Sequence, residues 1–167
     1  MKFEYYEKEW LEIVRRQEEL LRTDSFSAED ALRLGLTMER LAREEYREPI
    51  AIRIILGGHT AFSYLMDGTD SNNEWWMDKK LNTARMSGMS SLRTLMEVAE
   101  GNIPCEKEYE IENDYALCGG CFPLRRPDGR LIGYVESSGM AHQNDHQLIA
   151  DALAEQLGKK APSIREQ

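Results

Sequence analysis

Residues 50–66, IAIRIILGGHTAFSYLM, decide the fold of this chain. Isoleucine and leucine occupy the even positions from Ile50 to Leu56 and Arg53 stands between them, which is the period-two pattern of a β-strand. Gly57-Gly58 supplies a tight turn, and residues 60–66 resume the strand pattern. Because two strands joined by a short turn pair antiparallel, this stretch predicts a β-hairpin.

A second hairpin is predicted nearer the C-terminus. The stretches ALCGGCFPLRR, residues 116–126, and RLIGYVESS, residues 130–138, flank Pro127-Asp128-Gly129. Proline presets φ and glycine accepts a positive φ, so this tripeptide is typical of a turn. The preceding residues 101–114 show little periodicity and much charge, and they predict a loop with at most a short edge strand.

An N-terminal amphipathic helix is predicted over residues 1–24. Its stripe recurs at steps of three and four and includes one polar residue: Phe3, Tyr6, Trp10, Ile13, Gln17 and Leu20. A short seam of this kind suits packing on a partner subunit or on the helix's own domain, and the sequence leaves both alternatives open.

Further helices are predicted between and after the hairpins. Ser27 caps a helix that ends before Pro49, and turn residues 67–73 open another. Ser90 restarts a helix, and the final helix is expected to begin at Asn144 or Asp145.

The fold class is therefore α/β (α+β), an antiparallel sheet built from hairpins with helices packed around it. We expect residues 25–160 to form a single domain and residues 161–167 to form a polar tail.

Composition excludes several classes of protein. The chain has 167 residues and a formal charge of −9, which argues against a nucleic-acid partner because phosphate binding needs Lys and Arg. No apolar run approaches the roughly 20 residues that span a bilayer, and the N-terminus is too charged for a signal peptide. With three cysteines and no export signal, we expect a cytoplasmic protein with reduced thiols and no membrane partner.

Cys118 and Cys121 have the spacing of a redox or metal motif. A redox pair usually lies at a helix N-terminus, whereas Phe122, Pro123 and Leu124 continue as strand. Zinc needs four ligands, and only Cys105 and scattered histidines remain to complete a set. We therefore expect no metal site, and we expect the glycines between the cysteines to matter for close backbone packing.

Trp75 and Lys79, like Trp76 and Lys80, are four apart on a predicted helix, so each ammonium can lie over an indole ring. An exposed tryptophan beside lysines suits a planar or anionic ligand or a second subunit. The alternative is one tryptophan in the core and two solvated lysines.

His142 and His146 are also four apart, but a cap at residue 144 or 145 leaves His142 in the preceding loop. His146 then lies in the first turn facing the buried stripe, where a neutral structural histidine is the usual outcome. No Ser-His-Asp order, P-loop or dinucleotide glycine motif is present.

Several stretches together resemble the haem-degrading HbpS-like family, also called GlcG-like, and its uncharacterised cytoplasmic branch of small bacterial and fungal proteins. They are DALRLGLTMERLA, PIAIRI, DGTDSNNEWWMDKK, GGCFPLRRPDGRLIGYVESSGM and NDHQLIADAL. The resemblance implies a profilin-like architecture assembled as homodimers or larger rings. It places ligand-binding or interface residues at Asp70, Asn72, Trp75, Lys79, Lys80, Gly119, Gly120, Phe122, Pro123, Gly139, Asp145 and His146.

Three hypotheses follow. The first is a non-catalytic, oligomeric binding protein that holds haem or another planar anionic molecule near Trp75, Lys79 and His146. The second is an assembly protein in which the residues that the resemblance singles out, from Asp70 to His146, form subunit contacts. We call these residues the signature residues. The third is a small-molecule enzyme with His146 as acid or base beside Asp145. A protein without catalytic activity is favoured, because no nucleophile or second base pairs with His146 by spacing.

Overall fold

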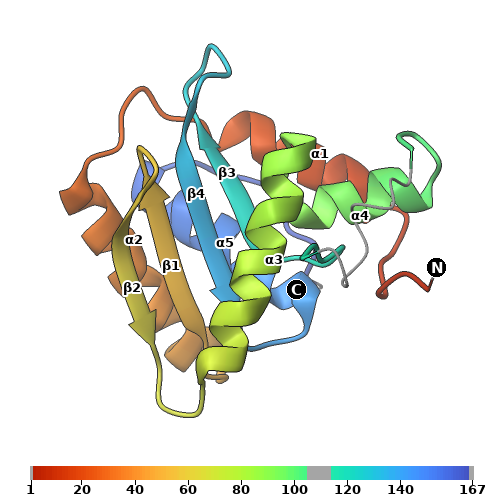
Figure 1. Ribbon diagram of the computed structural model, residues 1–167. Helices are drawn as coiled ribbons and strands as arrows, with labels where there is room; N and C mark the ends of the chain where they lie inside the picture. Colours follow the sequence, from red (N-terminus) through yellow and green to blue (C-terminus); the bar gives the residue numbers. More distant parts are fainter. Residues whose placement is uncertain (1, 105–113, 166–167) are drawn as a thin grey trace.

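Two hairpins meet in one antiparallel sheet. The computed structural model describes residues 2–104 and 114–165, and over these residues the sheet has four strands in the order β2-β1-β4-β3 (Figure 1). Every neighbouring pair is antiparallel, so both predicted hairpins are confirmed. The strands are β1 Ala51–Leu56, β2 His59–Leu65, β3 Cys121–Arg125 and β4 Leu131–Ser138.

The alternation along β1 separates the two faces of the sheet. Ile52 and Ile54 are fully buried in the main core, which helices α2 (Ala28–Leu41) and α5 (His142–Leu157) complete. Ile55 points the other way and packs with Leu81 of α3 (Ser71–Ser87). The sheet therefore lies between α2 and α5 on one face and α3 on the other (Figure 1).

The helix starts predicted at Ser27 and Ser90 are confirmed. Ser27 accepts the Asp30 N–H while Asp30 accepts the Ser27 N–H, a reciprocal capping box at the start of α2. A π-helical turn, η1 (Ala42–Tyr46), continues α2, and Arg47 with φ +57° follows before Pro49. Ser90 caps α4 (Ser91–Ala99) by accepting the Arg93 N–H.

The N-terminal helix is shorter than predicted. Helix α1 spans Trp10–Leu20, and the expectation that the helix already includes Phe3 and Tyr6 is wrong. The Tyr6 hydroxyl donates to Glu100 at 2.8 Å, and His142 Nε2 hydrogen-bonds the Tyr5 carbonyl at 2.7 Å. These contacts with distant residues hold residues 2–7 outside regular secondary structure, and a local periodicity does not reveal them.

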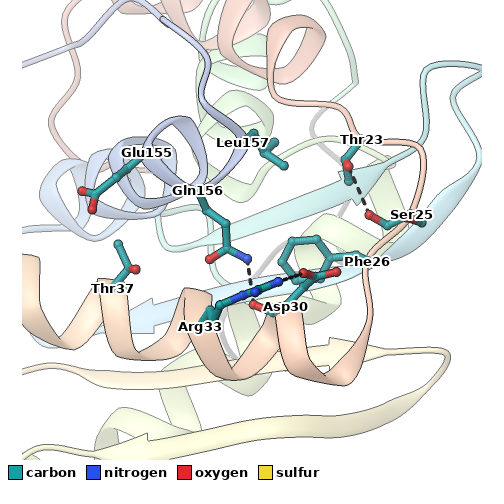
Figure 2. A pocket seen from close by; sticks show the side chains of 9 residues that line it. All are labelled: Thr23, Ser25, Phe26, Asp30, Arg33, Thr37, Glu155, Gln156 and Leu157. Atoms are coloured by element: carbon teal, nitrogen blue, oxygen red, sulfur yellow. Dashed lines mark hydrogen bonds and ion pairs between the residues drawn. The ribbon is translucent and has the colours of Figure 1, made fainter.

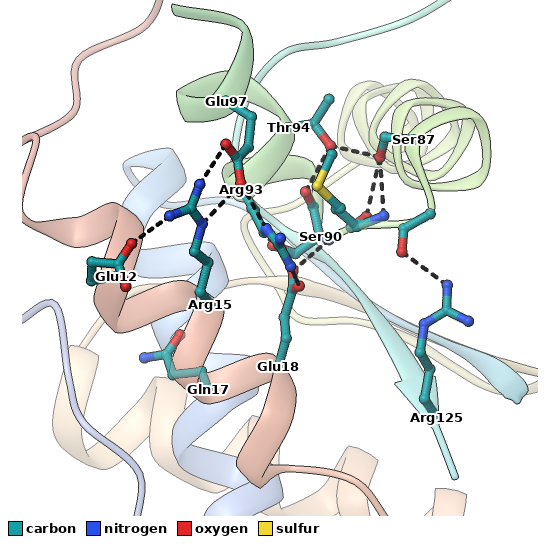
Figure 3. Close-up of polar contacts among 12 residues, drawn as sticks. Glu12, Arg15, Gln17, Glu18, Ser87, Ser90, Arg93, Thr94, Glu97 and Arg125 are labelled. Carbon is teal, nitrogen blue, oxygen red and sulfur yellow. Dashed lines mark hydrogen bonds and ion pairs between the residues drawn. The ribbon is translucent and has the colours of Figure 1, made fainter. Parts of the chain in front are cut away.

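Helix α1 packs on its own chain, which is one of the two alternatives the sequence left open. Arg15 donates twice to the buried Glu97 of α4, at 3.0 and 2.8 Å, and Arg93 donates to Glu18 at 2.7 Å (Figure 3). Beneath these ion pairs an apolar cluster joins the two helices and the end of the chain: Trp10, Leu11, Val14, Leu92, Leu95, Met96 and Ile164. The segment predicted to be a polar tail thus contributes the buried Ile164.

The final helix starts earlier than predicted. Ala141 precedes its first residue, His142, so the expected start at Asn144 or Asp145 is wrong, and His142 belongs to the helix. Residues 105–113 of the loop predicted at 101–114, including Cys105, lie outside the described residues.

Candidate functional site

The first signature residues cap helix α3. The Asp70 carboxylate accepts the Asn72 N–H at 2.8 Å, and the Asn73 side chain accepts the Asp70 N–H at 3.0 Å. Asn72 itself is exposed. Asp70 and Asn73 therefore fix where α3 begins, and this fixes the positions of the tryptophans and lysines that follow.

Lys80 and Asp145 form a buried ion pair between α3 and α5. Their side chains are 4% and 2% exposed, and Nζ lies 3.0 Å from Oδ2. Lys80 also donates to the Ser137 carbonyl at 3.1 Å, while the other Asp145 oxygen accepts the Ser137 hydroxyl and the Met140 N–H, each at 3.2 Å. Burial alone lowers the pKa of Lys80, but the Asp145 carboxylate outweighs it and the pKa is raised. The lysine is therefore a charged structural group, with two of its three N–H donors in these hydrogen bonds.

The signature glycines allow this close packing. A Cβ on Gly120 would lie 2.4 Å from the Ser137 carbonyl oxygen and 2.6 Å from Lys80 Nζ, and its φ is +128°. A Cβ on Gly119 would lie 2.4 Å from the His142 carbonyl oxygen, and one on Gly139 2.4 Å from the Pro49 carbonyl oxygen. All three positions need glycine because backbone approaches backbone there.

His146 is held in one neutral form by α1. The Gln17 amide NH₂ donates to the Gln147 side-chain oxygen and to the Pro162 carbonyl, both at 2.8 Å, so Gln17 Oε1 must be the acceptor for His146 Nε2 at 2.8 Å. The proton therefore sits on Nε2, and the buried Nδ1 has no partner among the described residues. Burial lowers the pKa of His146 to about 3. A residue that is 0% exposed and uncharged is poorly suited to acid–base work on a substrate.

Both ring nitrogens of His142 are hydrogen-bonded. Its Nδ1 accepts the Gly119 N–H at 3.0 Å, so Nε2 carries the proton that it donates to the Tyr5 carbonyl. Burial lowers its pKa. Because both ring nitrogens of His142 are engaged and His146 is fully buried, neither residue fits axial ligation of a haem iron. We call the set Lys80, Gly119, Gly120, Asp145 and His146 the buried junction.

Trp75 is the exposed member of the signature. It is 44% exposed, the Trp76 ring meets it edge-on at 5.0 Å, and Lys79 Nζ lies 4.4 Å from its ring centroid. The alternative of a core tryptophan beside solvated lysines is wrong, because neither tryptophan is buried whereas both lysines are. Lys79 also pairs with Asp114 at 3.3 Å, and Lys80 turns to Asp145 instead of Trp76.

The remaining signature residues, like Cys118 and Cys121, belong to the interior. Phe122 is 1% exposed, its ring lies 5.7 Å from that of His146, and Pro123 follows it on the edge strand β3. Burial raises the pKa of Cys118 to about 11 and that of Cys121 well above its ordinary value. Such thiols are unreactive. Within residues 2–104 and 114–165, no group of three His, Cys, Asp or Glu could hold a metal ion.

Sequence reasoning missed a second buried ion pair on the α3 face of the sheet. Arg53 of β1 donates to both oxygens of the fully buried Glu136 on β4, at 2.6 and 3.1 Å, and also pairs with Asp78 of α3 at 2.8 Å. Burial raises the pKa of Glu136 to about 7 despite the guanidinium. The sequence feature that pointed to this ion pair was a lone arginine in an apolar strand. Its partner could not be predicted, because it depends on the β1–β4 register, in which Arg53 lies opposite Glu136.

A cleft of about 490 Å³ lies away from all the signature residues (Figure 2). It lies between the start of α2 and the end of α5. Gln156 donates to the Asp30 carbonyl at 2.8 Å, and its own Oε1 is buried without a partner among the described residues. The lining is Thr23, Ser25, Phe26, Asp30, Arg33, Thr37, Glu155, Gln156 and Leu157.

Fold and site together define an antiparallel α+β protein whose motif residues mostly build its interior. A model of the family described as haem degrading protein HbpS-like matches residues 26–154. The UPF0303 protein YE1367 of Yersinia enterocolitica is 34% identical over 151 residues, covering 90% of this chain and 89% of that protein. The UPF0303 protein P4H10.12 of Schizosaccharomyces pombe is 35% identical over 155 residues, covering 92% and 87%. The chain therefore belongs to the HbpS-like family, and the resemblance seen in the sequence is confirmed.

Solved structures support the same fold. The Ybr137w protein superposes with a TM-score of 0.74 at 27% identity, covering 87% of this chain and 86% of that one. A crystal structure described as a PduOC–haem complex gives a TM-score of 0.65 at 22% identity, covering 78% and 94%. At that identity the second likeness concerns the fold alone. Along the described residues, no helix is long and apolar enough to cross a membrane.

Proposed function

We propose that this chain is a non-catalytic binding protein that takes a planar, anionic small molecule on the Trp75 face of α3. The observation that carries the proposal is the indole of Trp75, which remains 44% exposed while Lys79 lies against its ring. A flat ring with an ammonium beside it favours a flat ligand that bears negative charge, and such a ligand would share Lys79 with Asp114. Haem is one molecule of this class.

The remaining signature residues argue against catalysis. His146 is buried and neutral, and Lys80 and Asp145 satisfy each other. The PduOC likeness makes haemin a suitable probe. Because both ring nitrogens of His142 are engaged and His146 is fully buried, binding on this face would rest on stacking and charge without an axial histidine.

The test is a haemin titration of the full chain, followed through the Soret band. We expect saturable binding that weakens about three- to tenfold in Trp75→Ala, the loss of one aromatic contact. Met86→Ala is the matched control, because Met86 lies on the same helix and is 41% exposed. Absence of binding, or equal binding by both variants and the unmodified chain, would overturn the proposal for this face.

Self-association is a second candidate function. It is supported by exposed apolar side chains on two elements that contact each other, Leu32 and Leu36 on α2 and Tyr64 on β2. Soluble monomers rarely expose large contiguous apolar patches unless these bind something. Light scattering across a dilution series measures the mass directly, and a monomer at every concentration would contradict self-association.

We propose that this chain acts in the cytoplasm. Cys118 and Cys121 are free and buried, as expected where thiols stay reduced.

A further inference from the structure

The two edges of the sheet are not equivalent. On the β3 edge, Pro123 has no N–H to offer a further strand, and the Arg125 carbonyl already accepts the Thr23 N–H at 3.0 Å. On the β2 edge, residues 60–65 contain neither proline nor a charged side chain. Natural proteins usually block an edge with such residues, so β2 lacks a protection that β3 has.

The β1–β2 register shows which backbone groups face outward. Met66 N–H donates to the Ile50 carbonyl at 3.1 Å, and antiparallel pairs alternate, so Tyr64 and Phe62 are bonded to β1. The N–H and C=O groups of Ser63 and Leu65 then point away from β1. Among the described residues no hydrogen bond to these groups is found. They are positioned to pair with another strand.

Helix α2 borders the same edge with an apolar stripe. A Cβ on Gly35 would lie 2.3 Å from the Phe62 ring, so α2 and β2 are in direct contact, and Figure 1 shows them side by side at the end of the sheet. Leu32 and Leu36 are 49% and 55% exposed, and Tyr64 on β2 is 48% exposed. We call Leu32, Leu36, Ser63, Tyr64 and Leu65 the α2/β2 edge.

We propose that the α2/β2 edge binds the same edge of a second copy of this chain about a two-fold axis, with the two β2 strands antiparallel. The proposal deepens the self-association proposed above and rests on it. A two-fold contact is self-complementary, so the unpaired groups of one strand find their partners on its copy. The sheet then continues across both molecules.

Charge complementarity favours a second copy as the occupant. Glu29, Leu32, Leu36 and Arg43 follow one another at helical spacing on the outer side of α2 and η1. An axis at Leu36 places Leu36 against the partner's Leu36. The same axis sets Glu29, seven positions before it, opposite the partner's Arg43, seven positions after it. Arg43 already pairs with Glu39 and Glu44 of its own chain, at 3.1 and 3.3 Å, so Glu29 of the second copy would join these carboxylates around it. Apolar side chains thus meet at the centre, and opposite charges meet at both ends.

The first experiment measures mass by light scattering and sedimentation on the full chain. Leu36→Glu puts two carboxylates at the axis, and Ser63→Pro removes an outward N–H that β1 does not use. We expect each to weaken association at least tenfold. Leu131→Glu is the matched control, because Leu131 is 43% exposed on β4 and should leave the mass unchanged.

A charge exchange tests the predicted axis. Glu29→Arg alone should weaken association by facing the partner's Arg43, Arg43→Glu alone should do the same, and the double variant should regain most of the lost affinity. Circular dichroism confirms that each variant is folded.

If the unmodified chain is a monomer, both the self-association and this surface are overturned. An oligomer that Leu36→Glu and Ser63→Pro leave intact would overturn the surface alone.

Discussion

The buried junction and the α2/β2 edge differ in where their polar groups find partners. In the junction, Lys80, Asp145 and His146 are each no more than 4% exposed and are paired within the chain. At the edge, the outward groups of Ser63 and Leu65 have no partner among the described residues. The residues that carry the family resemblance are thus mainly those that stabilise the fold, while the proposed contact surface at the α2/β2 edge lies outside the signature. Membership of the family therefore predicts the fold better than an activity.

The largest effect is expected from breaking the junction at its ion pair. Asp145→Ala leaves the buried Lys80 without its carboxylate and orphans the Ser137 hydroxyl and the Met140 N–H. Loss of one partner of a buried pair costs about 3–5 kcal/mol of unfolding free energy. Urea denaturation measures this loss. Asp67→Ala, at an exposed position, is the control and should stay within about 0.5 kcal/mol. A loss below about 1 kcal/mol for Asp145→Ala would show that the junction is not a stabilising element.

His146 gives the junction a pH dependence that the exposed edge lacks. Its pKa of about 3 lies below its ordinary value of 6.5, so only the unfolded chain takes up a proton between these values. The resulting stability is complete above pH 6.5 and is lost as the pH falls toward 3. Between pH 6.5 and pH 5 we expect a loss of about 2 kcal/mol that His146→Ala abolishes.

Glu136 acts with the opposite sign, because its pKa of about 7 lies above its ordinary 4.5 and its contribution to stability falls as the pH rises through that range. The contribution of Glu136 is present in the unmodified chain and in His146→Ala, so it cancels when their unfolding free energies are compared. Chemical denaturation of the unmodified chain and of His146→Ala at pH 5 and pH 7.5 measures the loss assigned to His146. Equal changes in the unfolding free energy of the two proteins between these pH values would contradict the prediction.

Gly120 tests how tightly the junction is packed. Gly120→Ala forces a Cβ against the Ser137 carbonyl and Lys80, at a φ of +128°. We expect a loss of about 1–3 kcal/mol from overpacking beyond the backbone strain. Gly129→Ala supplies the comparison, since φ is +88° there but nothing lies within 4 Å of the added Cβ. Equal losses for the two variants would mean that strain alone matters and that the close approach does not.

The smallest effects are expected at the exposed surfaces. Trp75→Ala and Leu36→Glu remove side chains that are 44% and 55% exposed, so each should change the unfolding free energy of the monomer by no more than about 0.5 kcal/mol. Chemical denaturation of dilute protein measures this quantity. A loss of several kcal/mol would show that either residue supports the fold, and would weaken its assignment to a binding surface.

The parts of the fold that depend on near neighbours could be predicted from the sequence. The β1–β2 hairpin follows from alternation and Gly57-Gly58, and the starts of α2 and α4 follow from Ser27 and Ser90. These features are set by sterics and by hydrogen bonds within a few residues. Where a distant contact intervenes, the prediction was wrong. Tyr6 binds Glu100, which shortens α1, and His142 binds Gly119 and Tyr5 at the start of α5.

The sequence by itself determined an antiparallel α+β chain, the caps at Ser27 and Ser90 and the family, because these depend on periodicity, local chemistry and a set of motifs. Only the tertiary structure decided that Lys80 pairs with Asp145 instead of lying over Trp76, that Gln17 holds His146 neutral, and that β2 is an open edge. Residues 80 and 145, or 17 and 146, are far apart along the chain. Their pairing depends on how the helices pack on the sheet. This long-range packing decides which polar groups are hydrogen-bonded in the interior and which stay accessible at the surface.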